Sequence, residues 1–478
     1  MPKRGRETTV PSRAFAGGMN KHIYFPDADV EHEPEPLSER RELKKKRKVS
    51  RVSETLTPAS KPRRFPSTSN QFGVLRALHR PKQRRREISS SRVEFHREWS
   101  YSSRDFSGCR DRLVVVSYNI LGVENASKHP DLYSGVPAKF LKWKRRKRLI
   151  CEEIRLYNAG ILCLQAGISN YILIYHSLCK WKDEPLDRYN FYEVDLFQDL
   201  AVDLQKDGYD GVFKGRTGEA VDGCAIFWKD QRFTLVHEEN IEFRTFGLRD
   251  NVAQLCVLKI NQTEENANLP ARSSMYHTSQ SRHVLVGNIH VLFNPNRGDV
   301  KLGQIRLFLE KAYELSEKWG GIPVILGGDL NSVPESAVYQ FLASSQLDIR
   351  LHDRRNISGQ MASQSFRSMA RSYRTISRPF MYRWTHEELR LAAGSYGVTS
   401  LSHQLKLSSA YIAIPGSSRC RDRCGEPIAT SYHSSFMGTV DYIWHTEELV
   451  PVRVLETLPV DILRRTKGFP SKVIYNCK

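Results

Sequence analysis

The feature that most constrains the fold of this chain is a series of short, apolar, β-branched runs that begins near residue 112. The first run, at residues 113–121, reads LVVVSYNIL, and the second, at residues 160–164, reads GILCL. Runs of this length that are rich in Val, Ile and Leu are typical of buried strands. We therefore predict core strands in these two segments and in five more, which are residues 223–228, 252–260, 283–292, 323–326 and 439–445.

Two segments between these runs carry apolar residues at helical spacing. They are residues 143–157, with Leu149, Ile150 and Ile154 on one side, and residues 302–319. Strands mixed with helices, with polar residues placed directly after several strands, indicate an α/β or α+β layered enzyme whose site lies at the strand ends.

Most of the positive charge lies before the first predicted strand. The chain has 478 residues and a formal charge of +20, and residues 1–110 hold 26 Lys and Arg against 13 Asp and Glu. This segment is rich in Pro, Ser, Arg and Glu, so it cannot bury enough apolar surface to offset the conformational entropy lost on folding. We expect residues 1–110 to be disordered and residues 111–478 to form the folded domain.

A compact basic cluster lies inside the N-terminal segment. It consists of Lys44, Lys45, Lys46, Arg47 and Lys48, and a shorter cluster covers residues 84–86. Such clusters are bound by nuclear import receptors or attracted to nucleic-acid phosphates. We expect an import receptor to bind residues 44–48, and hence a location in nucleus and cytoplasm. The alternative is a merely solvated run of charge.

Several classes of protein are excluded. No stretch approaches the roughly 18 apolar residues of a membrane-spanning helix, and no apolar signal-peptide region follows the basic N-terminus. We therefore expect no membrane partner. Nine scattered cysteines fit a reducing compartment better than a disulfide framework, and without a paired C-x-x-C they predict no zinc site.

Polar side chains with metal-binding and phosphate-binding chemistry follow the predicted strands. Asn119 ends the first strand, Asn288 and His290 lie in the strand at 283–292, Asp329 and Asn331 follow another, and Asp441 opens the last. Carboxylates and carboxamides suit Mg²⁺, and an imidazole can neutralise a phosphoryl oxygen. Each residue taken alone also fits an ordinary turn or cap.

Eight motifs, in this order, resemble the exonuclease–endonuclease–phosphatase superfamily, and more closely the carbon catabolite repressor four-like deadenylases of plants. The family fold implied is α+β, with two packed, mostly antiparallel sheets flanked by helices. The motifs are SYNIL at 117–121, HPDLY at 129–133, DGYDGVFKGRTG at 207–218, VDGCAIFW at 221–228, LRDNVAQ at 248–254, NIHVLFNPNRGDVKLGQ at 288–304, GGDLNSVP at 327–334 and FMGTVDYIW at 436–444.

The resemblance implies Mg²⁺-dependent hydrolysis of RNA from its 3′ end, which removes the poly(A) tail of mRNA as adenosine monophosphate, within a deadenylase complex. It also implies roles for matched residues. Asn119 and Glu193 would hold the metal, Asp329 would orient or activate water, Asn331 would align substrate, and His290 and Asp441 would support the scissile phosphate. The implied substrate-binding residues are Pro295 and Phe436, which would pack on an adenine ring, together with Asn251 and Asn288. For Phe436 the alternative is a core aromatic.

Two departures from the family pattern bear on activity. In the family a Glu directly follows the Gln that ends the second strand, whereas here residues 166–192, an insertion of 27 residues, separate Gln165 from Glu193. The family's C-terminal Ser-Asp-His motif is also missing, as in a C-terminally truncated domain. Both departures predict impaired activity. A catalytically incomplete RNA-binding isoform and a phosphatase acting on a small nucleotide therefore remain as alternatives.

One region has no clear periodicity. Residues 354–404 are rich in Ser and Arg, and we expect a variable loop over one rim of the domain. Its Arg side chains would either follow an RNA backbone or remain solvated.

Overall fold

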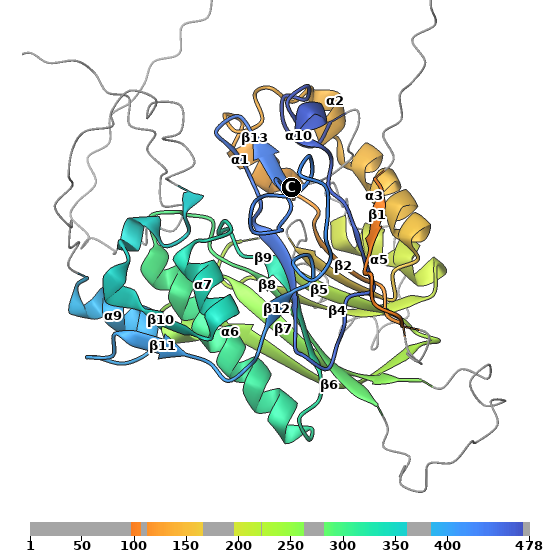
Figure 1. Ribbon diagram of the computed structural model, residues 1–478. Helices are drawn as coiled ribbons and strands as arrows, with labels where there is room; N and C mark the ends of the chain where they lie inside the picture. The colour runs from red at the N-terminus through yellow and green to blue at the C-terminus, as the bar shows by residue number, and fades with distance from the viewer. Residues whose placement is uncertain are drawn as a thin grey trace, which may run out of the picture. The chain divides into compact units, whose positions relative to one another are not determined.

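Two β-sheets pack face to face between two layers of helices (Figure 1). The structure, a computed structural model, describes residues 97–106, 112–165, 196–220, 222–261, 282–360 and 384–471. One sheet has six strands in the order β12-β15-β9-β8-β7-β6, and the other has four in the order β2-β3-β5-β4. The predicted α+β fold of two packed sheets flanked by helices is confirmed.

The four-stranded sheet contains β2 (Val115–Asn119), β3 (Ile161–Gln165), β5 (Gly223–Lys229) and β4 (Tyr209–Gly215). Its outer face is covered by α3 (Trp143–Tyr157) and α5 (Leu196–Lys206). Side chains alternate along β3, because Leu162 and Leu164 pack with these helices while Cys163 faces the second sheet. Both faces of β3 are therefore buried, which explains why the run is apolar throughout.

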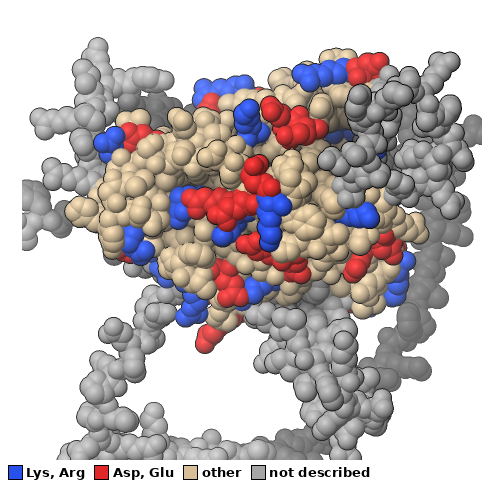
Figure 2. Space-filling view, turned by 90° about the horizontal axis from the view of Figure 1, so that it is seen from below, with Lys and Arg blue, Asp and Glu red and all other residues tan. Residues whose placement is uncertain are grey.

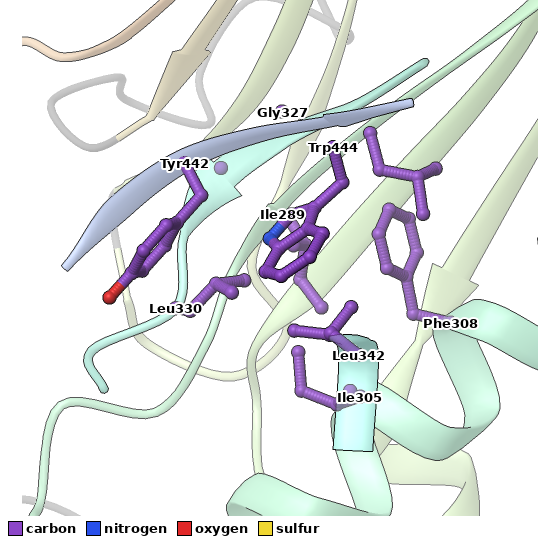
Figure 3. A pocket seen from close by; sticks show the side chains of 10 residues that line it. Ile289, Ile305, Phe308, Gly327, Leu330, Leu342, Tyr442 and Trp444 are labelled. Atoms are coloured by element: carbon purple, nitrogen blue, oxygen red, sulfur yellow. The ribbon is translucent and has the colours of Figure 1, made fainter. Parts of the chain in front are cut away.

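The six-stranded sheet contains β12 (Ser408–Ser409), β15 (Asp441–His445), β9 (Val324–Asp329), β8 (His283–His290), β7 (Val252–Ile260) and β6 (Phe233–Glu242). Its outer face packs against α6 (Gly298–Lys318) and α7 (Ala337–Ser344), and α9 (His386–Ala393) packs on α6. Figure 3 shows this contact, where Tyr442 and Trp444 meet Phe308 and Leu342 around a small apolar cavity. The helix layer therefore anchors the strands that lead to the site.

Shorter elements complete the domain. They are β1 (Trp99–Tyr101), α1 (Val123–Lys128), α2 (Ala138–Leu141), β10 (Gln346–Asp348), β11 (Ser400–Ser402), β13 (Ser431–His433), β14 (Phe436–Gly438), β16 (Arg453–Leu455), α10 (Val460–Leu463) and 3₁₀ turns at Phe243–Phe246, Ile349–Leu351 and Arg354–Asn356.

Two of our sequence predictions need correction. Trp99–Tyr101 form β1, which pairs antiparallel with β16, so the disorder predicted for residues 1–110 is wrong for this strand. The predicted loop at residues 354–404 contains α9, whose first turn is closed by a capping box between Thr385 and Glu388. In both cases the element is short and is stabilised by packing against residues far away in the sequence, so it leaves no long periodic pattern to predict it from. Residues 1–96 lie outside the described part of the chain.

The surface away from the site is mixed in charge. Figure 2 shows Lys and Arg interspersed with Asp and Glu on the face seen from below. Ion pairs such as Lys311 with Glu314 on α6 and Lys214 with Glu242 follow this pattern. Within the described ranges, no helix is long and apolar enough to cross a membrane.

Candidate functional site

Strand direction brings the predicted site residues to one edge of the sandwich. β8 and β9 run parallel, and His290 and Asp329, at their carboxyl ends, are register partners. β15 runs antiparallel to β9, so its first residue, Asp441, is the register partner of Asp329 on the other side. Residues opposite each other in adjacent strands project from the same face. Asp329 therefore has His290 and Asp441 as its immediate lateral neighbours.

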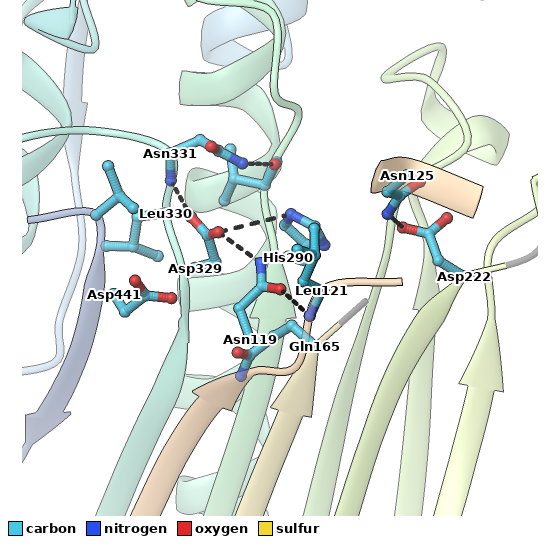
Figure 4. Close-up of polar contacts among 12 residues, drawn as sticks. Asn119, Leu121, Asn125, Gln165, Asp222, His290, Asp329, Leu330, Asn331 and Asp441 are labelled. Atoms are coloured by element: carbon cyan, nitrogen blue, oxygen red, sulfur yellow. Dashed lines mark hydrogen bonds and ion pairs between the residues drawn. The ribbon is translucent and has the colours of Figure 1, made fainter. Parts of the chain in front are cut away.

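Asp329 is the centre of the polar cluster in Figure 4. One carboxylate oxygen, Oδ2, accepts a hydrogen bond of 2.8 Å from Asn119 Nδ2, which comes from the other sheet. The same oxygen lies 3.8 Å from His290 Nε2. The other oxygen, Oδ1, accepts from the backbone N–H of Asn331 at 2.8 Å. The carboxylate is fully buried, so these partners fix its orientation.

Both carboxamides of this cluster are themselves held in place. Asn119 Oδ1 accepts from the Leu121 N–H at 3.0 Å, and Asn331 Nδ2 donates to the Val291 carbonyl at 2.8 Å. Asn119 and Asn331 are 1% and 2% exposed. The structure thus brings together Asn119, Asp329, Asn331, His290 and Asp441, all proposed from sequence.

Asp441 has a further contact of its own. Its Oδ2 accepts a hydrogen bond of 2.6 Å from Thr430 Oγ1, and the same hydroxyl accepts from the Asp441 N–H at 3.2 Å. Thr430 therefore sets the direction of the carboxylate next to Asp329.

The two other asparagines predicted to bind substrate lie deeper. Asn251 Nδ2 donates to the His290 carbonyl at 3.0 Å, so it positions the histidine backbone. Asn288 is fully buried between the sheets, where it donates to the Leu164 and Ala225 carbonyls and accepts from Gln165 Nε2. These contacts give Asn288 a structural role, and its side chain is closed off from a substrate at the surface.

The two predicted adenine-packing residues are also largely covered. Phe436, in β14, is 9% exposed, and its ring centroid lies 5.8 Å from that of His433. A Cβ at Gly438 would come within 2.8 Å of the Phe436 ring, so the glycine makes room for it. Pro295 is buried in the segment between β8 and α6. This burial of Phe436 is expected if it is a core aromatic, the alternative to adenine packing.

The oxygen donors at this edge fit a hard divalent cation. Asp329 and Asp441 supply carboxylates in adjacent strands, and Mg²⁺ is usually held by one or two carboxylates while it keeps several waters. Gln165 Oε1 is buried without a hydrogen-bond partner among the described residues, so a carbonyl oxygen is left at the end of β3. Glu193, the predicted acidic ligand, lies outside the described residues, which contain no cluster of three or more His, Cys, Asp or Glu side chains able to hold a metal.

A second carboxylate near His290 was missed by the sequence analysis. Asp222 is 4% exposed, and in Figure 4 His290 lies between it and Asp329. Burial disfavours its charged form, but the charges of Arg216 and His290 and a hydrogen bond from Asn125 outweigh burial, so the pKa of Asp222 is lowered. Asp222 belongs to the motif VDGCAIFW, and a carboxylate directly before a predicted strand was the signal that could have marked it as a site residue.

Two buried cations below the site were also missed. Arg146 of α3 and Lys301 of α6 are both fully buried. Arg146 donates to the Ile120 and Leu121 carbonyls, and Lys301 donates to those of Leu292 and Asn331. In the sequence they looked like solvated helix charges.

The stability of the domain is expected to rise with pH above neutrality because of Lys301. Burial lowers its pKa from 10.5 to about 7, with the charge of Asp329 acting in the opposite direction. Between pH 7 and about 10.5 the unfolded chain holds a proton that the folded chain lacks, so raising the pH favours the folded state. Below pH 7 both states hold it and the dependence vanishes.

We expect Lys301→Met to reduce this rise. Melting temperatures measured from pH 6.5 to 9.5 should increase less in the variant than in the unmodified chain. An equal increase in both would show that Lys301 does not titrate in this range.

Comparison with known proteins agrees with this geometry. A model of the Endonuclease/Exonuclease/phosphatase family matches residues 116–466, and the chain belongs to this family. It is thus a member of a family of hydrolases, as the resemblance seen in the sequence predicted.

Within the family, the chain is similar to the Arabidopsis thaliana protein "Carbon catabolite repressor protein 4 homolog 5", with 54% identity over 83% of this chain and 81% of that protein. It is 24% identical to "CCR4-Not complex 3'-5'-exoribonuclease subunit Ccr4" of Phaeosphaeria nodorum, over 78% of this chain and 60% of that one. Among solved structures it resembles "ANGEL2, a 2',3'-cyclic phosphatase", with a TM-score of 0.56, 26% identity, and coverage of 80% of this chain and 96% of that chain. The predicted similarity to plant carbon catabolite repressor four-like proteins is confirmed.

Proposed function

We propose that this chain is a Mg²⁺-dependent 3′-to-5′ exoribonuclease that removes poly(A) tails from mRNA as adenosine monophosphate. The observation that carries the proposal is the convergence of Asp329, Asn119 and His290, from both sheets, on one edge. The relative named as a 3'-5'-exoribonuclease subunit supports the proposed reaction. The Arabidopsis relative supports membership of the carbon catabolite repressor four-like group.

The residues of this edge supply the steps of phosphodiester hydrolysis. Asp329, held by Asn119 and the Asn331 N–H, is the fixed acceptor that orients the attacking water. His290, 3.8 Å from Asp329 Oδ2, offers an imidazole to a nonbridging phosphate oxygen. Asp441, directed by Thr430, supports the same region from the neighbouring strand. Because Asp329 is buried and hydrogen bonded before substrate arrives, this carboxylate needs little reorganisation during reaction.

A bound Mg²⁺ would neutralise charge on the phosphate and lower the pKa of its bound water. The oxygens of Asn119, Asp329 and Asp441, with Glu193 from the segment outside the described residues, are the ligands we propose for it. Asn119 Oδ1, which accepts one hydrogen bond from the Leu121 N–H, would offer its second lone pair to the ion.

A second candidate function is hydrolysis of a small nucleotide phosphate. The similarity to a 2′,3′-cyclic phosphatase favours it. The two functions are separated by giving the purified protein, with Mg²⁺, an RNA ending in A20 and, separately, adenosine 2′,3′-cyclic phosphate. Our proposal expects turnover of the RNA at a higher kcat/KM. Turnover of the cyclic nucleotide alone would replace it with the second function.

If Phe436 packs on an adenine ring, as the family resemblance implies, Phe436→Leu should reduce the preference for a poly(A) tail. Stacking of a base on an aromatic ring contributes about 1–3 kcal/mol, so the ratio of rates on A20 and on a non-A tail should fall by about tenfold. Leucine keeps much of the apolar volume, and the melting temperature should change little. If both rates fall together and the melting temperature drops, Phe436 is a core aromatic.

We also propose the cellular context expected from the sequence. A deadenylase complex is the proposed assembly, since one relative is named as a subunit of the CCR4-Not complex. Import through residues 44–48, with a location in nucleus and cytoplasm, is proposed from the basic cluster alone.

A further inference from the structure

The two turns that carry the catalytic side chains both contain a residue in the left-handed conformation. Leu121, two residues after Asn119, has φ 51°, and Asn331, two residues after Asp329, has φ 44°. Neither is glycine, and a leucine in this region is strained. Such residues persist only where surrounding contacts hold them, and they concentrate at functional sites.

Each left-handed residue orients a catalytic side chain through its own N–H. The Leu121 N–H donates to Asn119 Oδ1 at 3.0 Å, and the Asn331 N–H donates to Asp329 Oδ1 at 2.8 Å. Since Asn119 Nδ2 donates to Asp329 Oδ2, the two turns are coupled through one carboxylate. Relaxation of either turn would therefore rotate groups in both.

The carbonyl oxygen of each left-handed residue accepts hydrogen bonds from a buried basic side chain. Arg146 Nη1 donates to the Leu121 carbonyl at 2.5 Å and to that of Ile120 at 2.7 Å, while its Nε donates to Leu141 at 3.1 Å. Lys301 Nζ donates to the Asn331 carbonyl at 2.9 Å and to that of Leu292 at 2.5 Å. The two basic side chains come from helices on opposite sides of the sandwich, α3 and α6.

We propose that Arg146 and Lys301 are positioning residues that hold the two left-handed turns and thereby orient Asn119 and Asp329. The effect on the reaction rests on the proposed hydrolase function, whereas the effect on the turns does not. Neither cation touches the substrate edge directly, so each acts through the backbone that it binds.

Within the described part of the chain, Arg146 is not held in place by an ion pair. Among the ion pairs of the described residues, none joins Arg146 to a carboxylate, and its Nη2 is buried without a hydrogen-bond partner there. Its guanidinium lies 5.3 Å from the ring centroid of Trp143. Burying an unpaired cation is unfavourable, so its contacts to the turn must compensate for that cost. Burial lowers its pKa to about 10, which leaves it charged at neutral pH.

The test for Arg146 is rescue of the Arg146→Ala variant by free guanidinium. We expect kcat on A20 RNA to fall about 10- to 100-fold with KM little changed, and millimolar guanidinium to restore most of it. Urea, which is planar and neutral, should restore much less. Arg148→Ala, an exposed arginine on the same helix, is the matched control and should behave as the unmodified chain.

Hydrogen exchange gives a readout independent of activity. In Arg146→Ala, the peptide covering residues 117–123 should exchange faster than in the unmodified chain, and guanidinium should slow it again. Unchanged exchange and kcat, or a loss that guanidinium does not reverse, would overturn the inference. If the unmodified chain does not hydrolyse RNA, the proposed function fails, and exchange alone decides the role of Arg146.

Two further variants keep the inference testable. If Arg146→Ala does not fold, Arg146→Lys takes its place, since it keeps the charge but has fewer donors. Its kcat should fall several-fold, and the peptide covering residues 117–123 should exchange faster. A kcat and an exchange rate equal to those of the unmodified chain would overturn the inference. Lys301→Met should speed exchange of the peptide covering residues 329–333 and lower kcat, with Lys311→Met on the same helix as control. Unchanged exchange in Lys301→Met would remove Lys301 from the proposal.

Discussion

Asp329→Asn is expected to lower RNA hydrolysis by about 10²–10³-fold or more while the domain stays folded. The substitution keeps the shape of the side chain but removes the charge at the point where Asn119, Asn331 and His290 converge. Loss of one preorganised group that stabilises the transition state typically costs about this much in rate.

The structural cost of the same substitution is expected to be modest. Both oxygens of Asp329 accept from N–H donors, so the new amide NH₂ must face one of them and one hydrogen bond is lost. Leaving one buried donor without a partner costs about 1–3 kcal/mol in the free energy of unfolding. Rates are compared at a temperature well below the melting point of both proteins. Asp210→Asn, an exposed position on β4, is the control. Equal rates in Asp329→Asn and the unmodified chain would remove Asp329 from the reaction.

Excision of residues 166–192 is expected to raise the rate of RNA hydrolysis by about 10²-fold. It joins Gln165, which ends β3 beside Asn119, directly to Glu193. A metal ligand must be placed to within about 0.5 Å, and the insertion interrupts the chain at the point where that ligand is expected. Loop closure is a minor factor, since each doubling of loop length costs only about 0.6 kcal/mol.

The variant that lacks residues 166–192 also tests whether the gain in rate depends on Glu193. Its half-saturating Mg²⁺ concentration should be lower than that of the full chain, and Glu193→Gln within it should remove the gain. If excision leaves both the rate and the Mg²⁺ dependence unchanged, Glu193 is not a ligand and the insertion does not impair the site.

The sequence was most informative where a side chain's place follows from the strand that carries it. Asn119, His290, Asp329 and Asp441 each lie at a strand end, and parallel or antiparallel pairing then brings strand ends together. The apolar runs located the core strands for the same reason. β4 and β6 were not predicted, because glycines and charged residues interrupt β4 and six of the ten residues of β6 are polar, so each strand has a weak apolar pattern.

Residues whose role depends on distant partners were not predictable in this way. Lys301 is one of several charged residues on α6, and only the fold shows that it lies under Asn331 and Leu292. Arg146 is part of a run of basic residues on α3 in which Lys144 and Arg148 are exposed. The resemblance assigned Asn288 to substrate binding, but its side chain points between the sheets.

Hydrolysis from the 3′ end distinguishes an exonuclease from an endonuclease, and the order in which products appear reveals it. An RNA with a 5′ label and an A20 tail is incubated with the full chain and Mg²⁺, and the products are resolved over time. We expect the labelled RNA to shorten one nucleotide at a time until the tail is gone, with adenosine monophosphate released from the first time point. Internal fragments appearing before adenosine monophosphate, or no Mg²⁺-dependent shortening in either the full chain or the chain lacking residues 166–192, would contradict this expectation.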